Sequence, residues 1–481
     1  MSEVPASVAD KKCFTAVKKI AGYIDISPTP YHAVECATRL LSKAGGQVPA
    51  NIKEAASPGL WYTSEDGALT AWRIGEHHHA RSGLHIVGAH TDSPNIRIKP
   101  LPDRGNYGYR QLNVAPYGGV LLNSWLGRDL GLAGRISYRN SQDNVSTKLV
   151  HINEPLMHIP QLAIHLDREV NERGLVLNPQ HQMSPIWGFN SMDADLKTSH
   201  MHDSCGGAHS DCKSSANSPE TKQALTTSII LSCQESDFLT TIATSANVDP
   251  DSVIGHDLMA FDLAPARFVG NENSILASGR VDDLVSCFSA LETLISISQE
   301  EADSNEHIPL LCLFDHEEVR SQSATSAASP RMLHIIDMLA TGFNSDADDR
   351  IASQAGSFFV SADGGHATHP NYTERHDAEH PVIINQGPML KVNINQHYAT
   401  DSTTGAFWRL ICEQANVPVQ YFVNRSDLPC GSTIGPIVAT RFGIKAVDVG
   451  CPQLAMHSSR ELCGVRDIAW LQAALRQFWL T

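Results

Sequence analysis

The chain of 481 residues is longer than one hydrophobic core usually serves, so we expect two domains, and its 42% of hydrophobic residues can build both cores. Its 52 acidic and 36 basic residues give a formal charge of -16, which disfavours nucleic acid and anionic membranes as partners. No window approaches the roughly 20 apolar residues of a membrane span, and the N-terminal residues lack the layout of a secretory signal. We therefore expect a cytoplasmic protein.

The eleven cysteines do not form the pattern of a disulfide framework. They lie at scattered spacings, and several, such as Cys287 and Cys312, have apolar neighbours, as small buried residues do. We therefore expect no disulfide framework, in keeping with a cytoplasmic address.

The N-terminal region alternates helix-like and strand-like segments. Residues 27–45, SPTPYHAVECATRLLSKAG, place Ala33, Cys36 and Leu40 at helical spacing behind a capping segment, which predicts an amphipathic helix. The apolar run LHIVGA at 84–89 predicts a buried strand.

The middle region, residues 99–251, is richer in Gly, Asn and short β-like runs, among them GVLLNSWLG, GLAGRISY and KLVHI. We interpret it as an inserted second domain. Within it, residues 188–228 are poor in large apolar side chains, which predicts a mobile loop. This loop holds possible zinc ligands, but no flanking hairpin or helix would fix their geometry, so a solvated insertion is the favoured interpretation. The possible ligands are His200, His202, Cys205, His209 and Cys212.

The C-terminal region resumes the alternation of strands and helices. Its predicted elements are strands at 308–314, 357–361 and 445–449 and a helix at 284–297. Such alternation indicates an α/β fold with a mostly parallel sheet flanked by helices on both sides. Residues 1–98 and 252–481 would then form one discontinuous domain around the β-rich insert.

Histidines and carboxylates stand where the apolar runs end or a helix begins. They are His90 in GAHTDSP, Asp282 in GRVDDL, Glu317 and Glu318 in FDHEEV, Asp363 in SADGGH and His457 in QLAMHS. Ligands of open α/β sheets gather beyond the carboxyl ends of the strands, so these groups can converge there. Imidazole and carboxylate suit a divalent ion such as zinc, and two such ions activate a water and hold the oxygens of a reacting amide. The combination predicts a two-metal hydrolase.

Each of these groups also has an ordinary structural explanation. An isolated HTD is commonly a turn with a capping Asp, although Asp92 could hold the His90 imidazole if the strand continues. Glu317 and Glu318 would face opposite ways in an extended segment, so that one binds metal and the other addresses water, but such pairs are commonly solvated. Asp282 precedes a helix, where a carboxylate can be a cap or can bridge two cations. Their joint occurrence favours the metal site.

The same residues belong to longer blocks that strongly resemble the aspartyl aminopeptidases, a family of cytosolic two-metal exopeptidases. The blocks are GAHTDSPNIRIKP, GRVDDLVSCF, FDHEEV, SADGGHATHPNY, LKVNINQHYA, and DLPCGSTIGP followed by GCPQLAMHSSRE. SPTPYH, YGGVLLNSWLGRDLGLAGRI and IPQLAIHL extend the likeness over nearly the whole chain. The resemblance implies two divalent metal ions per subunit, with Zn2+ as the first choice and Mn2+ or Co2+ as alternatives.

The resemblance also assigns a role to each residue of the metal site. The ligands are Asp282 as the bridge, His90 and Asp363 for one ion, and Glu318 and His457 for the other. Glu317 becomes the general base that takes a proton from the attacking water and returns it to the leaving amine. Asp92 becomes a further catalytic group beside His90.

Specificity in this family is for peptides with an N-terminal Asp or Glu, and a cation is required to bind such a side chain in a partly dry pocket. Lys391 matches the family position that meets the acidic group, although lysines are more commonly solvated. His366 and Tyr398 match further substrate contacts, and Glu317 and Asp363 also face the substrate.

His165, in IPQLAIHLDREV, resembles a histidine that the family's inserted dimerisation domain donates to the substrate site across a subunit boundary. From the sequence alone, His165 would be a residue on the surface of a helix. The resemblance implies a homododecamer built from dimers, in which the oligomer completes each active site.

Two residues near the site depart from the family pattern. Asp283 stands where Asn is usual and adds a negative charge, and Arg320 stands where Gly is common, so the local turn could differ.

Two alternatives stay open, namely a clan-related aminopeptidase, deacylase or carboxypeptidase of different specificity, and a non-catalytic assembly or cargo protein. The presence of Glu317 disfavours the second, because an inactive relative needs no base.

Overall fold

The computed structural model describes residues 8–189 and 236–481, and the chain divides into two compact units. The first unit comprises Met1–Pro94, Tyr117–Leu121 and Ala264–Thr481, and the second comprises Asn95–Pro116 and Leu122–Leu263. All five possible zinc ligands from His200 to Cys212, and most of the loop predicted at 188–228, lie outside the described residues. Within the described ranges, no helix is long and apolar enough to cross a membrane.

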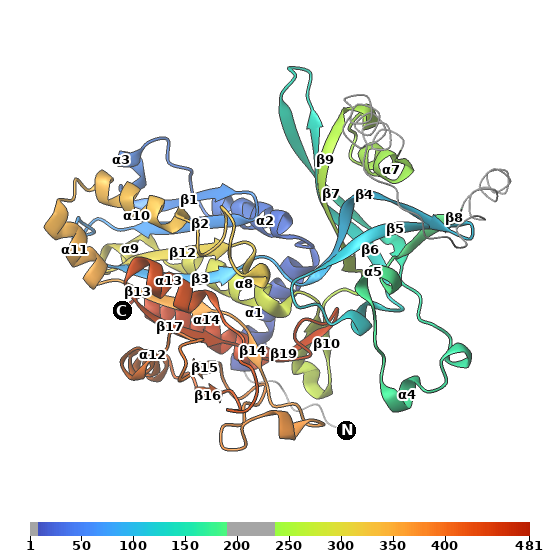
Figure 1. The fold of residues 1–481 in the computed structure, drawn as a ribbon. Coiled ribbons are helices and arrows are strands. Elements are labelled where there is room, and N and C mark those ends of the chain that lie inside the picture. Colours follow the sequence, from blue (N-terminus) through green and yellow to red (C-terminus); the bar gives the residue numbers. More distant parts are fainter. Residues whose placement is uncertain (1–7, 190–235) are drawn as a thin grey trace, which may run out of the picture. The chain divides into compact units, whose positions relative to one another are not determined.

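A sheet of eight strands organises the first unit, in the order β1-β2-β12-β3-β13-β17-β15-β16 (Figure 1). β12, β3, β13 and β17 pair in parallel at its centre, and β15 pairs in parallel with β16. The pairs β1–β2, β2–β12 and β15–β17 are antiparallel. The strands are β1 Gly59–Glu65, β2 Ala68–Ile74, β3 Leu84–His90, β12 Ile308–Phe314, β13 Phe358–Ala362, β15 Met389–Val392, β16 Gln420–Val423 and β17 Lys445–Gly450.

A smaller sheet of the first unit has the order β10-β11-β19-β18-β14. Its strands are β10 Arg267–Val269, β11 Ile275–Ser278, β14 Gly365–His366, β18 Pro452–Leu454 and β19 Glu461–Gly464. β18 and β19 matter for the site because the chain between them carries His457.

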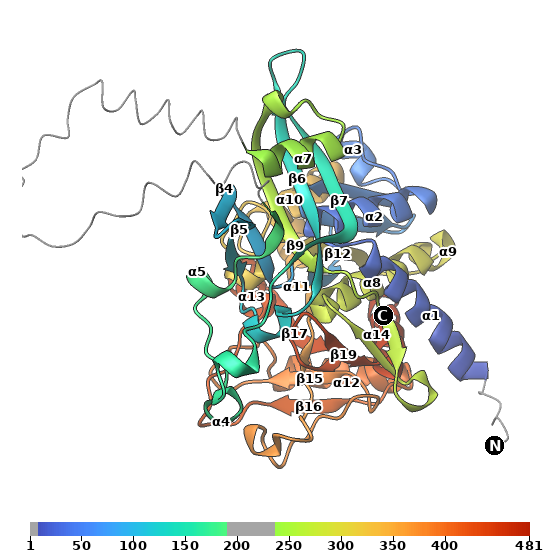
Figure 2. The same cartoon turned by 90° about the vertical axis from the view of Figure 1, so that its right-hand side faces the viewer.

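Helices cover both faces of the large sheet (Figures 1 and 2). Successive strand residues point to opposite faces, so Val87 and Leu311 join one apolar cluster while Ile86 and Leu310 join the other. The helices are α1 Val8–Asp25, α2 Pro30–Lys43, α3 Ile52–Ala55, α8 Val281–Ser296, α9 Gln299–Asp303, α10 Arg331–Gly342, α11 Ala347–Ala355, α12 Ser402–Gln414, α13 Ile434–Phe442 and α14 Val465–Trp479. The predicted α/β class is confirmed.

The helix expected within residues 27–45 is α2, which begins at a proline and is capped by the Thr29 side chain. Short 3-10 helices complete the first unit. They are η4 Asn271–Asn273, η5 Glu317–Val319 and η6 Thr373–Arg375.

The second unit contains a closed barrel in the order β4-β5-β8-β7-β6-β9. Its elements are β4 Asn95–Asn106, β5 Tyr109–Tyr117, η1 Leu122–Trp125, β6 Asp129–Arg139, β7 Val145–His158, η2 Ile164–Leu166, α4 Val170–Arg173, α5 Pro179–Gln182, β8 Ile186–Phe189, α7 Asp237–Ser245, η3 Pro250–Ser252 and β9 Val253–Asp262. The β-like prediction for GVLLNSWLG is wrong, because this run forms η1. Gly118 and Gly127 near its two ends have φ of 71° and 72°, which turn the chain before a strand can extend.

Candidate active site

The central strands bring the predicted residues to one edge of the large sheet. His90 is the last residue of β3, Asp363 directly follows β13, and Glu317 begins η5 shortly after β12. Because these strands run parallel, their carboxyl ends meet at the same edge. Asp282 lies in the first turn of α8, where its φ and ψ are not helical, and His457 follows β18.

Asp282 lies between two histidines. Its Oδ1 is 3.3 Å from Nε2 of His90, and its Oδ2 is 3.4 Å from Nε2 of His457. The same His457 nitrogen lies 3.3 Å from Oε1 of Glu318. Possible ligand atoms gather in three groups, and within each group all atoms lie within 4.8 Å of one another. The groups are His90 with Glu317 and Glu318, His90 with Asp283 and Asp363, and Asp282 with Glu318 and His457.

Several buried oxygens of these groups have no hydrogen-bond donor. In the part of the chain that the structure describes, Oδ1 of Asp282, Oδ1 of Asp283 and Oε1 of Glu318 are buried and accept no hydrogen bond. An unpaired buried carboxylate oxygen is costly, whereas a cation would satisfy it. Imidazole nitrogens and carboxylate oxygens are also the ligands that zinc accepts. The residues present therefore fit divalent metal ions.

Asp92 connects His90 to the segment of the two glutamates. Nδ1 of His90 lies 2.9 Å from the Asp92 carbonyl oxygen, which leaves Nε2 available as a ligand. The Asp92 carboxylate accepts hydrogen bonds from the amides of Glu317 and Glu318, at 3.0 and 3.1 Å. The Tyr117 hydroxyl, which sequence analysis missed, donates to the same carboxylate at 2.7 Å. Asp92 therefore orients a backbone segment as well as an imidazole.

The expectation that Glu317 and Glu318 lie in an extended segment is wrong. They begin η5, between His316 and Arg320, whose φ angles are 63° and 78°. Both glutamate amides point to one acceptor, the Asp92 carboxylate, whereas successive amides of a strand point in opposite directions. Arg320 thus adopts the left-handed conformation that Gly adopts without steric cost, which explains why Gly suits this position.

A second buried carboxylate holds two predicted ligands in place. Glu461, the first residue of β19, accepts hydrogen bonds from the His457 amide at 2.7 Å and the Asp282 amide at 3.2 Å. Burial and the nearby Asp282 raise the pKa of Glu461 to about 8. Its only signal in the sequence is a position four residues after His457, a spacing that indicates no role by itself.

Burial and neighbouring charges shift the pKa values of the site. Burial and nearby carboxylates raise the pKa of Glu317 well above its usual range, and burial raises the pKa of Glu318 to about 7. Burial opposes protonation of His457, but Asp282 and Glu318 raise its pKa to about 11. Burial also raises the pKa of Asp283 well above its usual range. The protein surroundings alone therefore favour a neutral Asp283, similar in charge to the expected Asn.

Lys391 is buried, not solvated. Its Nζ donates a 2.6 Å hydrogen bond to the Gly364 carbonyl and lies 3.5 Å from Oδ2 of Asp363. The same nitrogen lies 5.5 Å from the centre of the Tyr398 ring. A cavity of about 250 Å³ has Tyr398 and His366 in its lining. Three of the predicted substrate residues thus lie near Asp363 or beside this cavity.

His165 belongs to the second unit, where it is exposed. It lies in η2, a 3-10 turn of three residues, so the expected placement on a helix surface is wrong. Its predicted role at a subunit boundary stays a prediction.

The α/β fold and the convergent ligands indicate a metal-dependent hydrolase, and known proteins agree with this class. Residues 23–479 match the family described as "Aminopeptidase I zinc metalloprotease (M18)". The "Probable M18 family aminopeptidase 2" of Streptomyces coelicolor is 40% identical over 457 residues, which cover 95% of each chain. Its counterpart in Mycobacterium tuberculosis is 38% identical over 463 residues, covering 95% of this chain and 96% of the relative. The chain therefore belongs to the M18 family of zinc metallo-aminopeptidases, and the predicted resemblance is confirmed.

Solved structures show the same fold. A chain in the cryo-EM structure of the Ape4 and Nbr1 complex aligns with a TM-score of 0.85 and 30% identity, covering 98% of this chain and 86% of that one. A subunit of the S. cerevisiae mApe1 dodecamer aligns with a TM-score of 0.77 and 26% identity, covering 97% of each chain.

Proposed function

We propose that this aminopeptidase releases N-terminal Asp or Glu from peptides at a site for two metal ions. The observation that carries the proposal is the position of Asp282, whose two oxygens each face a different histidine, as a bridging ligand requires. Zinc ions, or manganese or cobalt with the same ligands, would supply an activated water and polarise the peptide carbonyl. The proposed ligands are Asp282 as the bridge, His90 and Asp363 for one ion, and Glu318 and His457 for the other.

Glu317 is the proposed general base. Its burial and raised pKa favour proton uptake near neutral pH, and the Asp92 carboxylate fixes its backbone amide. Glu317 would take a proton from the attacking water and deliver it to the leaving amine. Asp92 acts in this scheme by positioning both Glu317 and His90.

The proposed preference for an acidic residue follows from Lys391 and from the arginines of the cavity that His366 and Tyr398 line. Lys391 is a buried cation beside Asp363, and a buried charge needs a counter-charge. The cavity lined by His366 and Tyr398 has two arginines, Arg375 and Arg425, and one carboxylate, Asp377, in its lining. Arg425 also pairs with Asp427, which lies outside the lining. These groups favour a carboxylate side chain over an apolar or cationic one.

The proposed assembly is a homododecamer built from dimers, with residues 99–251 as the dimerisation domain. The segment around His165 exposes Leu162, Ile164 and Leu166 to fractions of 65%, 47% and 75%. Apolar residues gathered in this way are commonly covered by a partner. The dodecameric mApe1 relative is consistent with such an assembly. A mass measurement in solution tests it directly, and a monomer that retains full activity contradicts it.

Glu317→Gln tests the catalytic proposal. The variant should keep its metal ions and lose about 10²- to 10⁴-fold in kcat, because proton transfer is lost while the ligands stay. Glu306→Gln, a change of an exposed glutamate, is the matched control. Full turnover in metal-loaded Glu317→Gln would contradict the mechanism.

Comparing Asp-, Glu-, Leu- and Lys-amide substrates on the unaltered enzyme separates the proposed specificity from that of another clan member.

A further inference from the structure

A second cavity, of about 470 Å³, lies at the other edge of the large sheet. Its lining includes Leu84 and Ile308, the first residues of β3 and β12, whereas the candidate metal ligands stand at or beyond the last residues of these strands. Side chains of α10, α11 and the end of α13 complete the walls. This cavity is therefore separate from the proposed active site.

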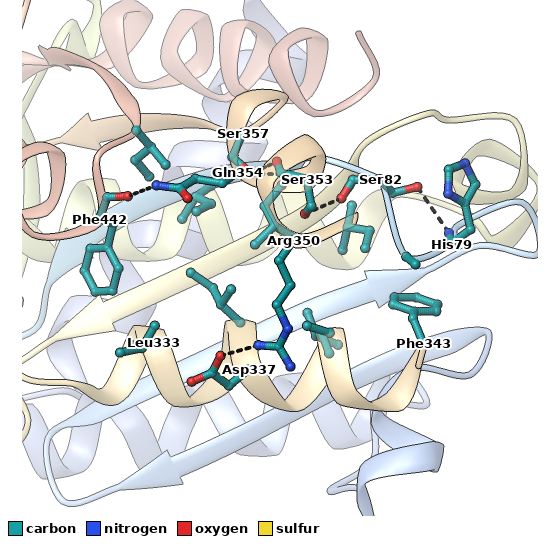
Figure 3. Close-up of a pocket in the computed structure, with 18 of the residues that line it drawn as sticks. His79, Ser82, Leu333, Asp337, Phe343, Arg350, Ser353, Gln354, Ser357 and Phe442 are labelled. Atoms are coloured by element: carbon teal, nitrogen blue, oxygen red, sulfur yellow. Dashed lines mark hydrogen bonds and ion pairs between the residues drawn. The ribbon is translucent and has the colours of Figure 1, made fainter. Parts of the chain in front are cut away.

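The inner surface of the cavity is apolar. Its apolar side chains come from the strand ends and from α10, and they include Leu84, Ile86, Ile308, Leu339 and Ile444. Two of the polar side chains that line it already have partners. Gln354 donates to the Phe442 carbonyl at 2.7 Å, and Ser353 donates to the Ser82 carbonyl at 2.8 Å (Figure 3). The volume and the lining are those of a pocket for a small, largely apolar ligand.

Two arginines supply positive charge to this lining. Figure 3 shows Arg350 reaching from α11 to Asp337 on α10, where the two side chains pair at 2.8 Å. These side chains are 43% and 51% exposed, so the pair contributes little and opens readily. Arg441 is exposed, and its side chain forms no hydrogen bond or ion pair with any residue that the structure describes. The lining thus has two guanidinium groups and a single carboxylate.

We propose that this cavity binds an amphipathic carboxylate with an unbranched apolar chain. The chain would occupy the space lined by Leu84, Ile308 and Leu339. The carboxylate would replace Asp337 as the partner of Arg350 and pair with Arg441, since planar guanidinium and carboxylate groups match in geometry. An anionic head at this place is favoured locally even though the chain as a whole carries a charge of -16.

Calorimetric titration of the full-length, metal-loaded enzyme with dodecanoate, below its micellar concentration, tests the proposal. Dodecanoate should saturate one site per subunit. Decanoate should bind roughly tenfold more weakly, because its chain is two CH2 groups shorter and buries less apolar surface. Dodecyltrimethylammonium, which has the same chain and a cationic head, should show no saturable binding.

Four variants locate the ligand. Ala340→Trp fills the cavity and should abolish binding, and Arg441→Glu should weaken it at least tenfold. Asp337→Asn removes the competing carboxylate and should tighten binding several-fold. Ile351→Trp is the matched control on α11, because Ile351 is 65% exposed and lies outside the lining.

Three results would overturn the proposal. They are the absence of saturable dodecanoate binding, equal binding of the cationic amphiphile, and unchanged binding in Arg441→Glu. If Ala340→Trp does not fold, Arg441→Glu and Asp337→Asn still test the proposed binding site. Both variants change exposed side chains, and they should shift the dodecanoate affinity in opposite directions.

Discussion

The two ends of β3 and β12 differ in chemistry although they belong to the same strands. At the amino ends, Leu84 and Ile308 line an apolar cavity. At the carboxyl ends, His90 and Glu318 join a cluster in which several buried carboxylate oxygens accept no hydrogen bond from the residues that the structure describes. The amino edge is therefore apolar and leaves a cavity, whereas the carboxyl edge has buried carboxylate oxygens that a cation would satisfy. Substitutions at the carboxyl edge should affect metal binding and turnover, and those at the amino edge should affect stability or the proposed binding in the cavity.

The largest effect expected at the carboxyl edge, after that of Glu317→Gln, comes from Lys391→Met. Loss of the buried cation should lower kcat/KM for Asp- and Glu-amide substrates by about two orders of magnitude, because an acidic side chain loses its counter-charge. The Leu-amide rate should change little, and Lys445→Met, at an exposed lysine, is the control. Equal losses on all substrates would show that Lys391 only supports Asp363.

Glu461→Gln should weaken metal binding by about 10- to 100-fold, because the side chain that positions Asp282 and His457 loses an acceptor. Competition with a chelator measures this affinity, with Glu306→Gln as the control. If the metal affinity of Glu461→Gln equals that of the unaltered enzyme, the Glu461 carboxylate does not position Asp282 and His457.

The stability of the fold should depend on pH through His85 at the amino edge. The His85 ring stacks on the His307 ring, with 3.9 Å between the ring centres. Burial and the charge of His307 lower the pKa of His85 to about 3. Between pH 6.5 and 3 the unfolded chain therefore binds more protons than the folded one, so stability should fall as pH falls, by up to about 1.4 kcal/mol per pH unit.

Thermal unfolding of His85→Asn at several pH values measures this contribution. The variant should be less stable near pH 7 but should lose less stability on acidification than the unaltered protein. Identical pH dependence in both proteins would exclude His85 as the titrating group.

The smallest effect should come from Arg320→Gly. Gly adopts the left-handed backbone at φ 78° without the steric cost that a residue with a Cβ has there. Gly also has more conformational freedom in the unfolded chain, so the free energy of unfolding should rise by no more than about 1 kcal/mol. Arg320→Ala is the control, because it keeps the backbone cost. Chemical denaturation that shows equal effects for both variants would contradict this explanation.

The sequence predicted the parts of this structure that local patterns encode. Apolar runs predicted β3 and β12, and the carboxyl-edge rule predicted the convergence of His90 and Asp363. The turn at Glu317 was not predictable locally, because Asp92, distant in the chain, binds its amide. Glu461 was missed for the same reason, since its partners are brought to it by the fold.

The amino-edge cavity gave no signal in the sequence. It arises from the packing of α10 and α11 over the ends of β3 and β12, and packing of this kind leaves no motif. The arginine that reaches across it resembles any exposed helical arginine when only the sequence is known.

Metal analysis of the purified enzyme, beside the variant Asp282→Asn, tests the central claim most directly. Two divalent ions per subunit in the unaltered enzyme, and the loss of at least one ion together with turnover in Asp282→Asn, are the predicted results. A single ion per subunit in the unaltered enzyme, or two ions retained in Asp282→Asn with full activity, would contradict a centre bridged by Asp282.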